Sequence, residues 1–418
     1  MSLVGRQLAS LNALIAEIAD RNAFYSAKLE QADGKNGFES LESFSTRMPF
    51  TTKKELAEDH ANHPPYGSNL TYPVSQYTRL HQTSGTSGHP LPWLDTPEGW
   101  QWVLDNWKAI WQECGAKAGE CAAFPFSFGP FLGFWVAFEA GVQIGLRCVP
   151  LGGQSSLERL KMIERYQPKW LCCTPTYALH LITVAEREGI DLSSTSVECL
   201  IVGGEPGGSV PEVRQRIESG LGDARLFDHH GMTEVGPVTY SDKEDGSLLR
   251  ILHDAYFCEV IDPETEKAVA EGDVGELVLT ALGRSGSPLL RYRTGDLVKA
   301  KSLPGEDPLA FALEGGILGR ADDMLIVRGV NLYPSAVDAV VRSIDGIGEY
   351  QVLIETKESM TEVSLTIECV SVGNSKRIDQ DLQKRLREVF SLRIPVTVVE
   401  TGTLPQFEMK AKRWVVKG

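Results

Sequence analysis

Between residues 146 and 208 the chain alternates three apolar strands with two amphipathic helices, and glycine or proline turns separate them. LRCVPLGG predicts a strand and a turn, SSLERLKMIERYQ a helix capped by serine, and KWLCCTP the next strand. TYALHLITVAEREG then predicts a second helix, and VECLIVGGEPGG a strand that runs into glycines. This order predicts right-handed parallel units in an α/β sheet covered on both faces. Ligands in such sheets bind beyond the carboxyl ends of the strands, where this chain has its glycines.

The rest of the chain divides into regions of a different pattern. The first eighty residues predict helices and connectors, and the Trp-rich helical face between Trp100 and Gln112 predicts core packing. After residue 220, YFCEVIDPETEKAV and GELVLTAL predict antiparallel strands in a small barrel or distorted second sheet. We expect a large domain over residues 1–318, a hinge at 319–323 and a small mobile α+β lid domain over 324–418. The elements expected in the lid are a helix from Ser335, strands near 350–355 and 362–370, a helix over 376–390 and a strand at 396–400.

Charge and cysteine content exclude several classes of partner. The net charge is -15 at pH 7, which repels phosphate backbones and anionic lipid, so we expect neither a nucleic-acid nor a membrane partner. No stretch approaches the ~20 apolar residues of a membrane span, and the N-terminus predicts an amphipathic helix instead of a secretion signal. The eight cysteines have no Cys-x-x-Cys spacing, which favours a reduced cytoplasmic location. His253 with Cys258, or Cys172 with Cys173, are explained better as buried groups than as metal ligands, so we expect no structural metal.

The segment TSGTSG at residues 83–88 can neither fill a core nor hold a helix. Its glycines let successive N–H groups converge on one point, and its four hydroxyls add donors to the same concavity. Such a cradle suits phosphate oxygens. It lacks the Gly-Lys-Ser/Thr ending of a Walker loop, and the glycines at 203–208 lack the dinucleotide-binding spacing. Considered alone, the segment is equally consistent with a flexible surface loop.

Further motifs follow in a fixed order along the chain. They are DHHGMTE at 228–234, RYRTGDL at 291–297, GRADDMLIVRGVNLYP at 319–334 and LPQFEMKAKRW at 404–414. Together with TSGTSG they make the sequence resemble the adenylate-forming superfamily of acyl-CoA synthetases across almost the whole chain. Within it, the sequence is most similar to phenylacetate-CoA ligases and related aryl-CoA ligases. This closer likeness rests on CCTPTYAL at 172–179, the Gly204-Glu205-Pro206 turn, DDMLIVRGVNLYPS and the compact C-terminus.

The resemblance implies a site for ATP and magnesium. It implies that the TSGTSG loop grips the β- and γ-phosphates and that Thr233 hydrogen-bonds the α-phosphate. It implies Glu234 as the magnesium ligand, because a triphosphate brought to a carboxylic acid needs a hard cation with oxygen ligands. Asp228 would accept from the adenine amine, and Asp296 would take both ribose hydroxyls, a task suited to an acceptor-only group. The nucleotide-binding residues implied are Thr83, Ser84, Gly85, Thr86, Ser87, Gly88, Gly204, Glu205, Pro206, Asp228, His229, His230, Gly231, Met232, Asp296, Arg320 and Asn331.

Several of these positions carry a specific expectation. His230 stands where the family commonly has tyrosine, so an imidazole would stack on adenine, and we expect ATP affinity to be weaker or sensitive to pH. The backbone of Gly204-Glu205-Pro206 would form the other wall of the purine slot, and Arg320 would reach the ribose or a phosphate. Many relatives have an arginine near the α-phosphate at the position of Asn331. The phenylacetate branch tends to carry asparagine there, as this chain does.

The C-terminal motif implies Lys410 as the catalytic lysine. Its ammonium would bridge the attacking carboxylate and the α-phosphate and would stabilise the pentavalent transition state. Met409 precedes it where relatives usually have glycine, and Lys412 is the competing candidate. The spacing from Pro405 favours Lys410. Asp322 is implied as the hinge about which the small domain turns between the two steps.

Residues 124–135 read FPFSFGPFLGFW and match the segment that lines the family's acyl pocket. The density of rings favours a flat or apolar acid. Phe131, Gly133 and Trp135 are the candidate contacts, although plain core packing explains any one of them equally well. Trp135 is expected to shorten the cavity.

The resemblance thus implies an ATP-dependent ligase that forms an aromatic or arylacetic acyl-adenylate and passes the acyl group to coenzyme A. The alternative is an adenylating enzyme that passes it to a carrier protein or an amine. A nucleotide sensor without catalysis is disfavoured, because it has no need of both Glu234 and Lys410. A homodimer is implied by the resemblance alone.

Overall fold

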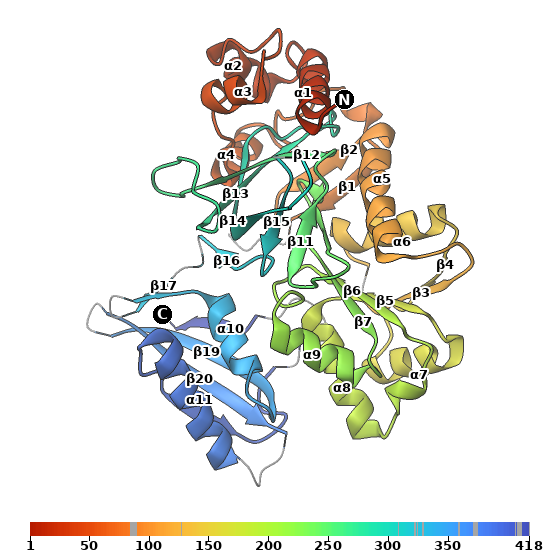
Figure 1. Cartoon of the computed structure of the whole chain (residues 1–418), viewed down its shortest axis with the longest axis vertical. Coiled ribbons are helices and arrows are strands. Elements are labelled where there is room, and N and C mark those ends of the chain that lie inside the picture. The colour runs from red at the N-terminus through yellow and green to blue at the C-terminus, as the bar shows by residue number, and fades with distance from the viewer. Residues whose placement is uncertain are drawn as a thin grey trace.

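The computed structural model describes most of the chain. The described residues are 1–83, 90–126, 128–307, 309–321, 323, 325–327, 330–357, 360–370, 375–405, 407 and 412–417, without the side chains of Phe134, Ile326, Asn331, Thr356, Lys357 and Met360. Four helices form one end of the molecule, two sheets with their helices follow, and the segment from β17 onward forms a separate C-terminal unit (Figure 1).

The first four helices confirm the helical pattern predicted for the start of the chain. They are α1 (Leu3–Ile18), α2 (Ala23–Gln31), α3 (Leu41–Arg47) and α4 (Lys53–Asn62). Each begins after a serine, asparagine or threonine whose side chain accepts from a backbone N–H of the first turn, which explains where each helix starts.

Five parallel strands in the order β4-β3-β5-β6-β7 form the predicted α/β sheet. The strands are β3 (Cys121–Phe124), β4 (Arg147–Pro150), β5 (Trp170–Cys173), β6 (Cys199–Gly203) and β7 (Arg225–His229). The helices are α5 (Pro97–Cys114), α6 (Leu132–Gln143), α7 (Ser156–Tyr166), α8 (Pro175–Glu188) and α9 (Pro211–Gly220). The predicted serine cap is Ser155, which forms a capping box with Glu158.

Helices cover both faces of this sheet, as its near-continuous apolar strands predict. Residues such as Cys173 face one core with α7, α8 and α9, whereas Cys172 faces another core with α5 and α6. The tryptophans of α5, including Trp107 and Trp111, are buried in that second core, which confirms the predicted packing. Because Cys172 and Cys173 point to opposite faces, they cannot share one metal ion.

The segment predicted as a barrel or distorted second sheet forms a seven-stranded sheet. Its order is β10-β11-β15-β14-β13-β12, and β16 pairs with β14. The two predicted segments pair antiparallel, with Tyr256 opposite Ala281. The strands are β10 (Thr239–Ser241), β11 (Leu248–Ile251), β12 (Tyr256–Ile261), β13 (Val274–Ala281), β14 (Tyr292–Ser302), β15 (Phe311–Glu314) and β16 (Gly319–Arg320).

The C-terminal unit has its own sheet, in the order β21-β20-β19-β22, and its own apolar core. The helices and strands predicted for residues 335–400 are confirmed. The unit comprises β17 (Leu325–Val327), β18 (Val330–Leu332), α10 (Pro334–Arg342), β19 (Ile347–Lys357), β20 (Met360–Cys369), α11 (Ser375–Phe390), β21 (Val396–Val399) and β22 (Trp414–Lys417). The sequence analysis missed β22, whose four residues WVVK carry no alternation and which pairs with β19 from more than fifty positions away.

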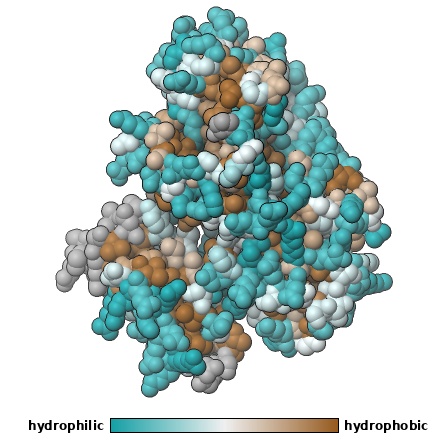
Figure 2. Space-filling view, in the orientation of Figure 1, coloured by the Kyte–Doolittle hydropathy of each residue, from teal (hydrophilic) through white to brown (hydrophobic). Residues whose placement is uncertain are grey.

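Two short hairpins lie between the large elements. In one, β1 (Arg79–Gln82) pairs with β2 (Pro92–Asp95), and in the other β8 (Gly231–Met232) pairs with β9 (Gly236–Pro237). Polar residues cover much of the face in view (Figure 2). None of the helices among the described residues combines the length and the apolar composition of a membrane span.

Candidate functional site

The backbone of Gln82 joins three of the predicted site segments. Its N–H donates to Pro130 O over 2.7 Å, and its carbonyl accepts from Thr233 Oγ1 over 3.4 Å. The next residue, Thr83, pairs with Leu91 through two 3.0 Å hydrogen bonds and closes the β1–β2 hairpin. Three segments therefore meet at one place. They are the start of the TSGTSG loop, the aromatic segment (residues 124–135) and the GMT turn (residues 231–233). The predicted phosphate ligands at 84–88 lie outside the described residues.

A buried ion pair holds the Thr233 backbone. Arg284 forms a fork to both Asp95 oxygens at 2.6 Å, and its Nη1 donates to Thr233 O over 2.9 Å. Arg284 and Asp95 have 0% and 1% of their surface exposed. Buried pairs of this geometry fix position more than they add stability. The sequence analysis missed both residues, because neither belongs to a recognised motif.

Glu234, the predicted magnesium ligand, is a buried carboxylate beside β14. Its Oε1 accepts a 2.8 Å hydrogen bond from the Tyr292 hydroxyl. Burial, and then the adjacent Glu234, hold the pKa of Tyr292 well above its ordinary value, so the phenol remains a neutral donor at neutral pH. Tyr292 belongs to the RYRTGDL motif, from which the sequence analysis selected Asp296 alone.

We expect Tyr292→Phe to lower the rate of the acyl-adenylate formation that the resemblance implies by about three- to tenfold, because removal of a buried partner costs about 1 kcal/mol. The variant should also require more Mg²⁺ for half-maximal rate, because the Glu234 carboxylate loses the donor that orients it. Pyrophosphate release titrated with MgCl₂ measures both effects. An unchanged Mg²⁺ requirement would contradict an orienting role for Tyr292.

The structure brings Asp296, Arg320 and His230 together. Asp296 and Arg320 face each other across β14 and β16, and Arg320 Nη1 donates to Asp296 Oδ1 over 3.1 Å. His230 Nε2 lies 3.3 Å from Asp296 Oδ2. The predicted ribose ligand therefore lies beside the predicted adenine contact, as one nucleoside requires.

The two histidines of DHHGMTE are half-buried and neutral. Burial, followed by the charges of His229 and Arg320, lowers the pKa of His230 to about 3. Burial lowers the pKa of His229 to about 4, and its ring packs 4.6 Å from the ring of Trp107. A group with the pKa of His230 does not titrate near neutral pH, which disfavours a pH-sensitive ATP affinity, whereas a weaker ATP affinity stays a prediction.

Asp228 lies at the carboxyl end of β7, where the fold places ligands. Its carboxylate accepts from Ser209 Oγ at 2.6 Å and from the His229 N–H at 2.9 Å. Gly208 lies against it so closely that an added Cβ would be 2.5 Å from Asp228 Cγ. Burial raises the pKa of Asp228 to about 6, against the lowering effect of the Ser209 hydroxyl.

This raised pKa predicts a pH-dependent cost in stability. Unfolded aspartate titrates near pH 3.9, so the folded state binds this proton more tightly and loses stability as pH rises from about 4 to about 6. We expect Asp228→Asn to be as stable as the parent protein near pH 4 and more stable at pH 7, by on the order of 2 kcal/mol. Urea unfolding of both proteins at several pH values measures the difference. A gain in the free energy of unfolding that does not change with pH would contradict the raised pKa of Asp228.

The Gly204-Glu205-Pro206 turn follows β6 and contacts the start of α8. Gly204 has φ +86°, a left-handed conformation that favours glycine. Glu205 Oε1 accepts a 2.8 Å hydrogen bond from the Thr176 N–H. Thr176 belongs to the CCTPTYAL segment, so the two sequence features behind the closer family likeness are in direct contact.

The aromatic segment is held by its own contacts. Trp135 Nε1 donates to Gly129 O over 2.9 Å, and the ring lies 4.8 Å from that of Phe128. Phe131 directly precedes α6, and a Cβ added at Gly133 would meet no described atom within 4 Å. Helix α6 contacts β8 and β9, so these candidates lie close to the GMT turn.

Besides residues 84–88, further predicted residues fall outside the described part of the chain. Lys410 and Asp322 lie outside the described residues, as does the side chain of Asn331. The competing candidate Lys412 is described and exposed.

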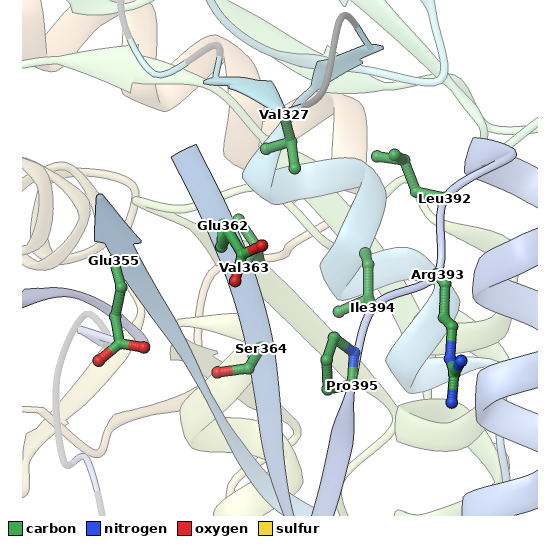
Figure 3. A pocket seen from close by; sticks show the side chains of 9 residues that line it. All are labelled: Val327, Glu355, Glu362, Val363, Ser364, Leu392, Arg393, Ile394 and Pro395. Carbon is green, nitrogen blue, oxygen red and sulfur yellow. The ribbon is translucent and has the colours of Figure 1, made fainter. Parts of the chain in front are cut away.

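Two cavities lie away from these residues. One, of about 220 Å³, lies in the C-terminal unit, where β20 and the residues before β21 separate (Figure 3). The other, of about 350 Å³, lies between α1, α5 and β11. No predicted site residue lines either one. The first is lined by Val327, Glu355, Glu362, Val363, Ser364, Leu392, Arg393, Ile394 and Pro395.

Comparison with known families identifies the chain. Residues 58–283, more than half of the 418, match the model of the AMP-binding enzyme family. The chain belongs to this family. Residues 329–417 match the AMP-binding enzyme C-terminal domain, which agrees with the separate C-terminal unit.

Curated relatives of this AMP-binding enzyme cover nearly its whole length. It is 31% identical to a phenylacetate-coenzyme A ligase of Pseudomonas putida, over 87% of this chain and 83% of the relative. It is 29% identical to the corresponding ligase of Thermus thermophilus, over 95% of this chain and 92% of the relative.

Solved structures add information on the arrangement of the C-terminal unit. A 2-hydroxyisobutyryl-CoA ligase in the postadenylation state, in complex with 2-HIB-AMP, superposes with a TM-score of 0.91 at 27% identity, over 98% of this chain and 89% of the other. The same ligase with 2-HIB-AMP and CoA in the thioesterification state gives a TM-score of 0.72 at 28% identity, over 98% and 88%. The arrangement in this AMP-binding enzyme is thus more similar to the postadenylation structure.

Proposed function

We propose that this AMP-binding enzyme is an AMP-forming acid–CoA ligase that acts through an acyl-adenylate. In the first step a substrate carboxylate attacks the α-phosphorus of ATP, and the bond to pyrophosphate breaks. In the second step the sulfur of coenzyme A attacks the acyl carbon, the bond to AMP breaks, and the thiol proton passes to solvent. One observation carries the proposal: three segments meet at the Gln82 backbone. They are the β1–β2 hairpin that holds TSGTSG, the turn with Thr233 and Glu234, and the aromatic segment.

Glu234 fits the role of magnesium ligand. It is a buried oxygen ligand with one oxygen held by Tyr292, and hard cations prefer carboxylates so placed. Bound magnesium would neutralise charge on the phosphates of ATP. Thr233 would contact the α-phosphate, in a position fixed by Arg284 through its backbone carbonyl.

The division into a large domain over 1–318, a hinge at 319–323 and a small domain over 324–418 is part of the proposal. Turning about Asp322 would withdraw Lys410 after adenylation and present another face of the small domain for coenzyme A. The separate sheet and core of the C-terminal unit support a rigid-body movement of this kind.

The proposed substrate is an aromatic or arylacetic acid. The rings of the segment around Phe128 and Trp135 support this class, as do the phenylacetate-coenzyme A ligases among the relatives. Trp135, whose indole donates to Gly129 O, would shorten the acyl pocket, which would favour a small acid within that class. Transfer to a carrier protein or an amine is the alternative to coenzyme A, and a homodimer remains a prediction.

A cytoplasmic location is also proposed. All eight cysteines are free thiols, and burial raises the pKa of several of them, including Cys148 to about 12. Free, unreactive thiols suit a reducing compartment.

A pyrophosphate-release screen tests the function. Aromatic, arylacetic and short branched acids are each supplied with MgATP, with and without coenzyme A. Acid-dependent release that proceeds to a CoA thioester is the expected result. Adenylate that accumulates in the presence of coenzyme A would favour a carrier or amine acceptor, and no release with any acid would overturn the proposal.

A further inference from the structure

Arg413 is the best-anchored side chain of the C-terminal motif among the described residues. Its guanidinium contacts both oxygens of Glu349, at 2.6 and 3.1 Å, and both side chains are buried. It also lies 5.1 Å from the ring centre of Tyr350. All three residues belong to the C-terminal unit, so these contacts move with the unit and set the direction in which Arg413 points.

The third nitrogen of the guanidinium contacts a residue outside the C-terminal unit. Arg413 Nη1 donates to Thr176 Oγ1 over 3.4 Å, which is a long hydrogen bond from a charged donor. Thr176 in turn donates its backbone N–H to Glu205, in the turn proposed as the adenine wall. The contact therefore links the segment that carries the proposed catalytic lysine, three positions before Arg413, to a wall of the nucleotide site.

A second polar contact crosses the same interface. Arg216 of α9 donates to Ile347 O at the start of β19 over 3.2 Å, and α9 packs beside α10 (Figure 1). Burial, followed by the charge of Arg342 across the interface, lowers the pKa of Arg216, while Glu186 and Asp345 oppose this effect. A contact made of hydrogen bonds, in which two arginines also repel each other, suits a surface that forms and releases.

We propose that Arg413 is a positioning residue for the adenylation step, which it supports by fixing the C-terminal unit against Thr176 and the Glu205 turn. The inference rests on the proposed ligase function. This protein is more similar to the postadenylation structure than to the thioesterification structure of the related ligase. The hydrogen bond from Arg413 to Thr176 therefore belongs to the postadenylation arrangement of the C-terminal unit. Rotation of the unit separates Arg413 from Thr176 and leaves the Glu349 pair intact.

The test compares the two half-reactions in Thr176→Val. This change removes the acceptor hydroxyl, keeps the side-chain shape and retains the backbone N–H to Glu205. We expect acid-dependent ATP–pyrophosphate exchange to fall about three- to tenfold, because one long and therefore weak hydrogen bond is lost. Thioester formation from supplied acyl-adenylate and coenzyme A should stay within about twofold of the parent rate, because that step uses the other arrangement.

Thr183→Val is the matched control, because it removes an exposed hydroxyl of the same helix that bonds Leu179 O. It should change neither half-reaction. Arg413→Lys, which keeps the charge but cannot form the three-way fork, should show the same split as Thr176→Val. An equal fall of both half-reactions in Thr176→Val, or no fall in either, would overturn the proposal.

A measurement that does not depend on activity separates this inference from the proposed function. Hydrogen exchange followed by mass spectrometry should be faster in Thr176→Val than in Thr183→Val for peptides over residues 211–220 and 345–352, which form the interface. Equal exchange in the two variants would refute the contact even if the parent protein proves to be a ligase. Faster exchange without any acid-dependent pyrophosphate release would retain the contact and overturn the proposed function.

Discussion

Lys410→Ala should lower acyl-adenylate formation by about a hundred- to a thousandfold, the loss seen when a single group that stabilises transition-state charge is removed. The attacking carboxylate and the α-phosphate are both anionic, so the ammonium is needed while they approach. Thioester formation from supplied acyl-adenylate should be largely retained, because no phosphate is displaced by a carboxylate in that step. Single-turnover assays of the two half-reactions measure the difference.

Lys412→Ala is the control for this prediction. Lys412 has the same charge two positions further on and its side chain is exposed, so its removal should leave adenylation near the parent rate. If adenylation instead fell in Lys412→Ala and stayed near the parent rate in Lys410→Ala, Lys412 would be the catalytic lysine. Equal loss of both half-reactions in Lys410→Ala would contradict the assigned role.

Glu234→Gln should lower adenylation by about a hundredfold or more, because it removes the anionic oxygen ligand from the proposed magnesium position. The amide has almost the same shape and can still accept from Tyr292, so the fold and the neighbouring Thr233 should be preserved. The Mg²⁺ concentration for half-maximal pyrophosphate release should rise at the same time. Thermal unfolding of the variant without nucleotide checks that the protein remains folded.

Tyr292→Phe provides a graded comparison for this second variant. It leaves the Glu234 charge in place and removes the hydrogen bond alone, so its Mg²⁺ requirement should lie between that of the parent and that of Glu234→Gln. An identical Mg²⁺ requirement in Glu234→Gln and the parent protein would exclude Glu234 as the ligand, whatever the fall in rate.

The sequence predicted the elements whose signals are local. Residues 146–208 carry apolar strands, a serine cap and glycine turns in one continuous stretch, and the parallel sheet follows from that order. Site residues within short motifs, such as Asp296 and Glu234, could be named for the same reason. In contrast, β22 has four residues and gains its place by pairing with a distant strand, so no local pattern marks it.

Residues that act through tertiary contacts could not be predicted. Arg284 and Asp95 are 189 positions apart and meet only after β2 packs beside the antiparallel sheet. Tyr292 was present in a recognised motif, but its direction toward Glu234 depends on how β14 lies against the GMT turn. The lowered pKa of His230 likewise follows from burial, which a pattern of letters does not reveal.

The junction at Gln82 has a consequence for how the enzyme can vary. Both of its hydrogen bonds use main-chain atoms, so nearly any amino acid at position 82 would preserve them. Proline is the exception, because it lacks the N–H that binds Pro130 O. Every other substitution at position 82 should therefore leave the junction of the three segments intact, because the main chain alone makes it.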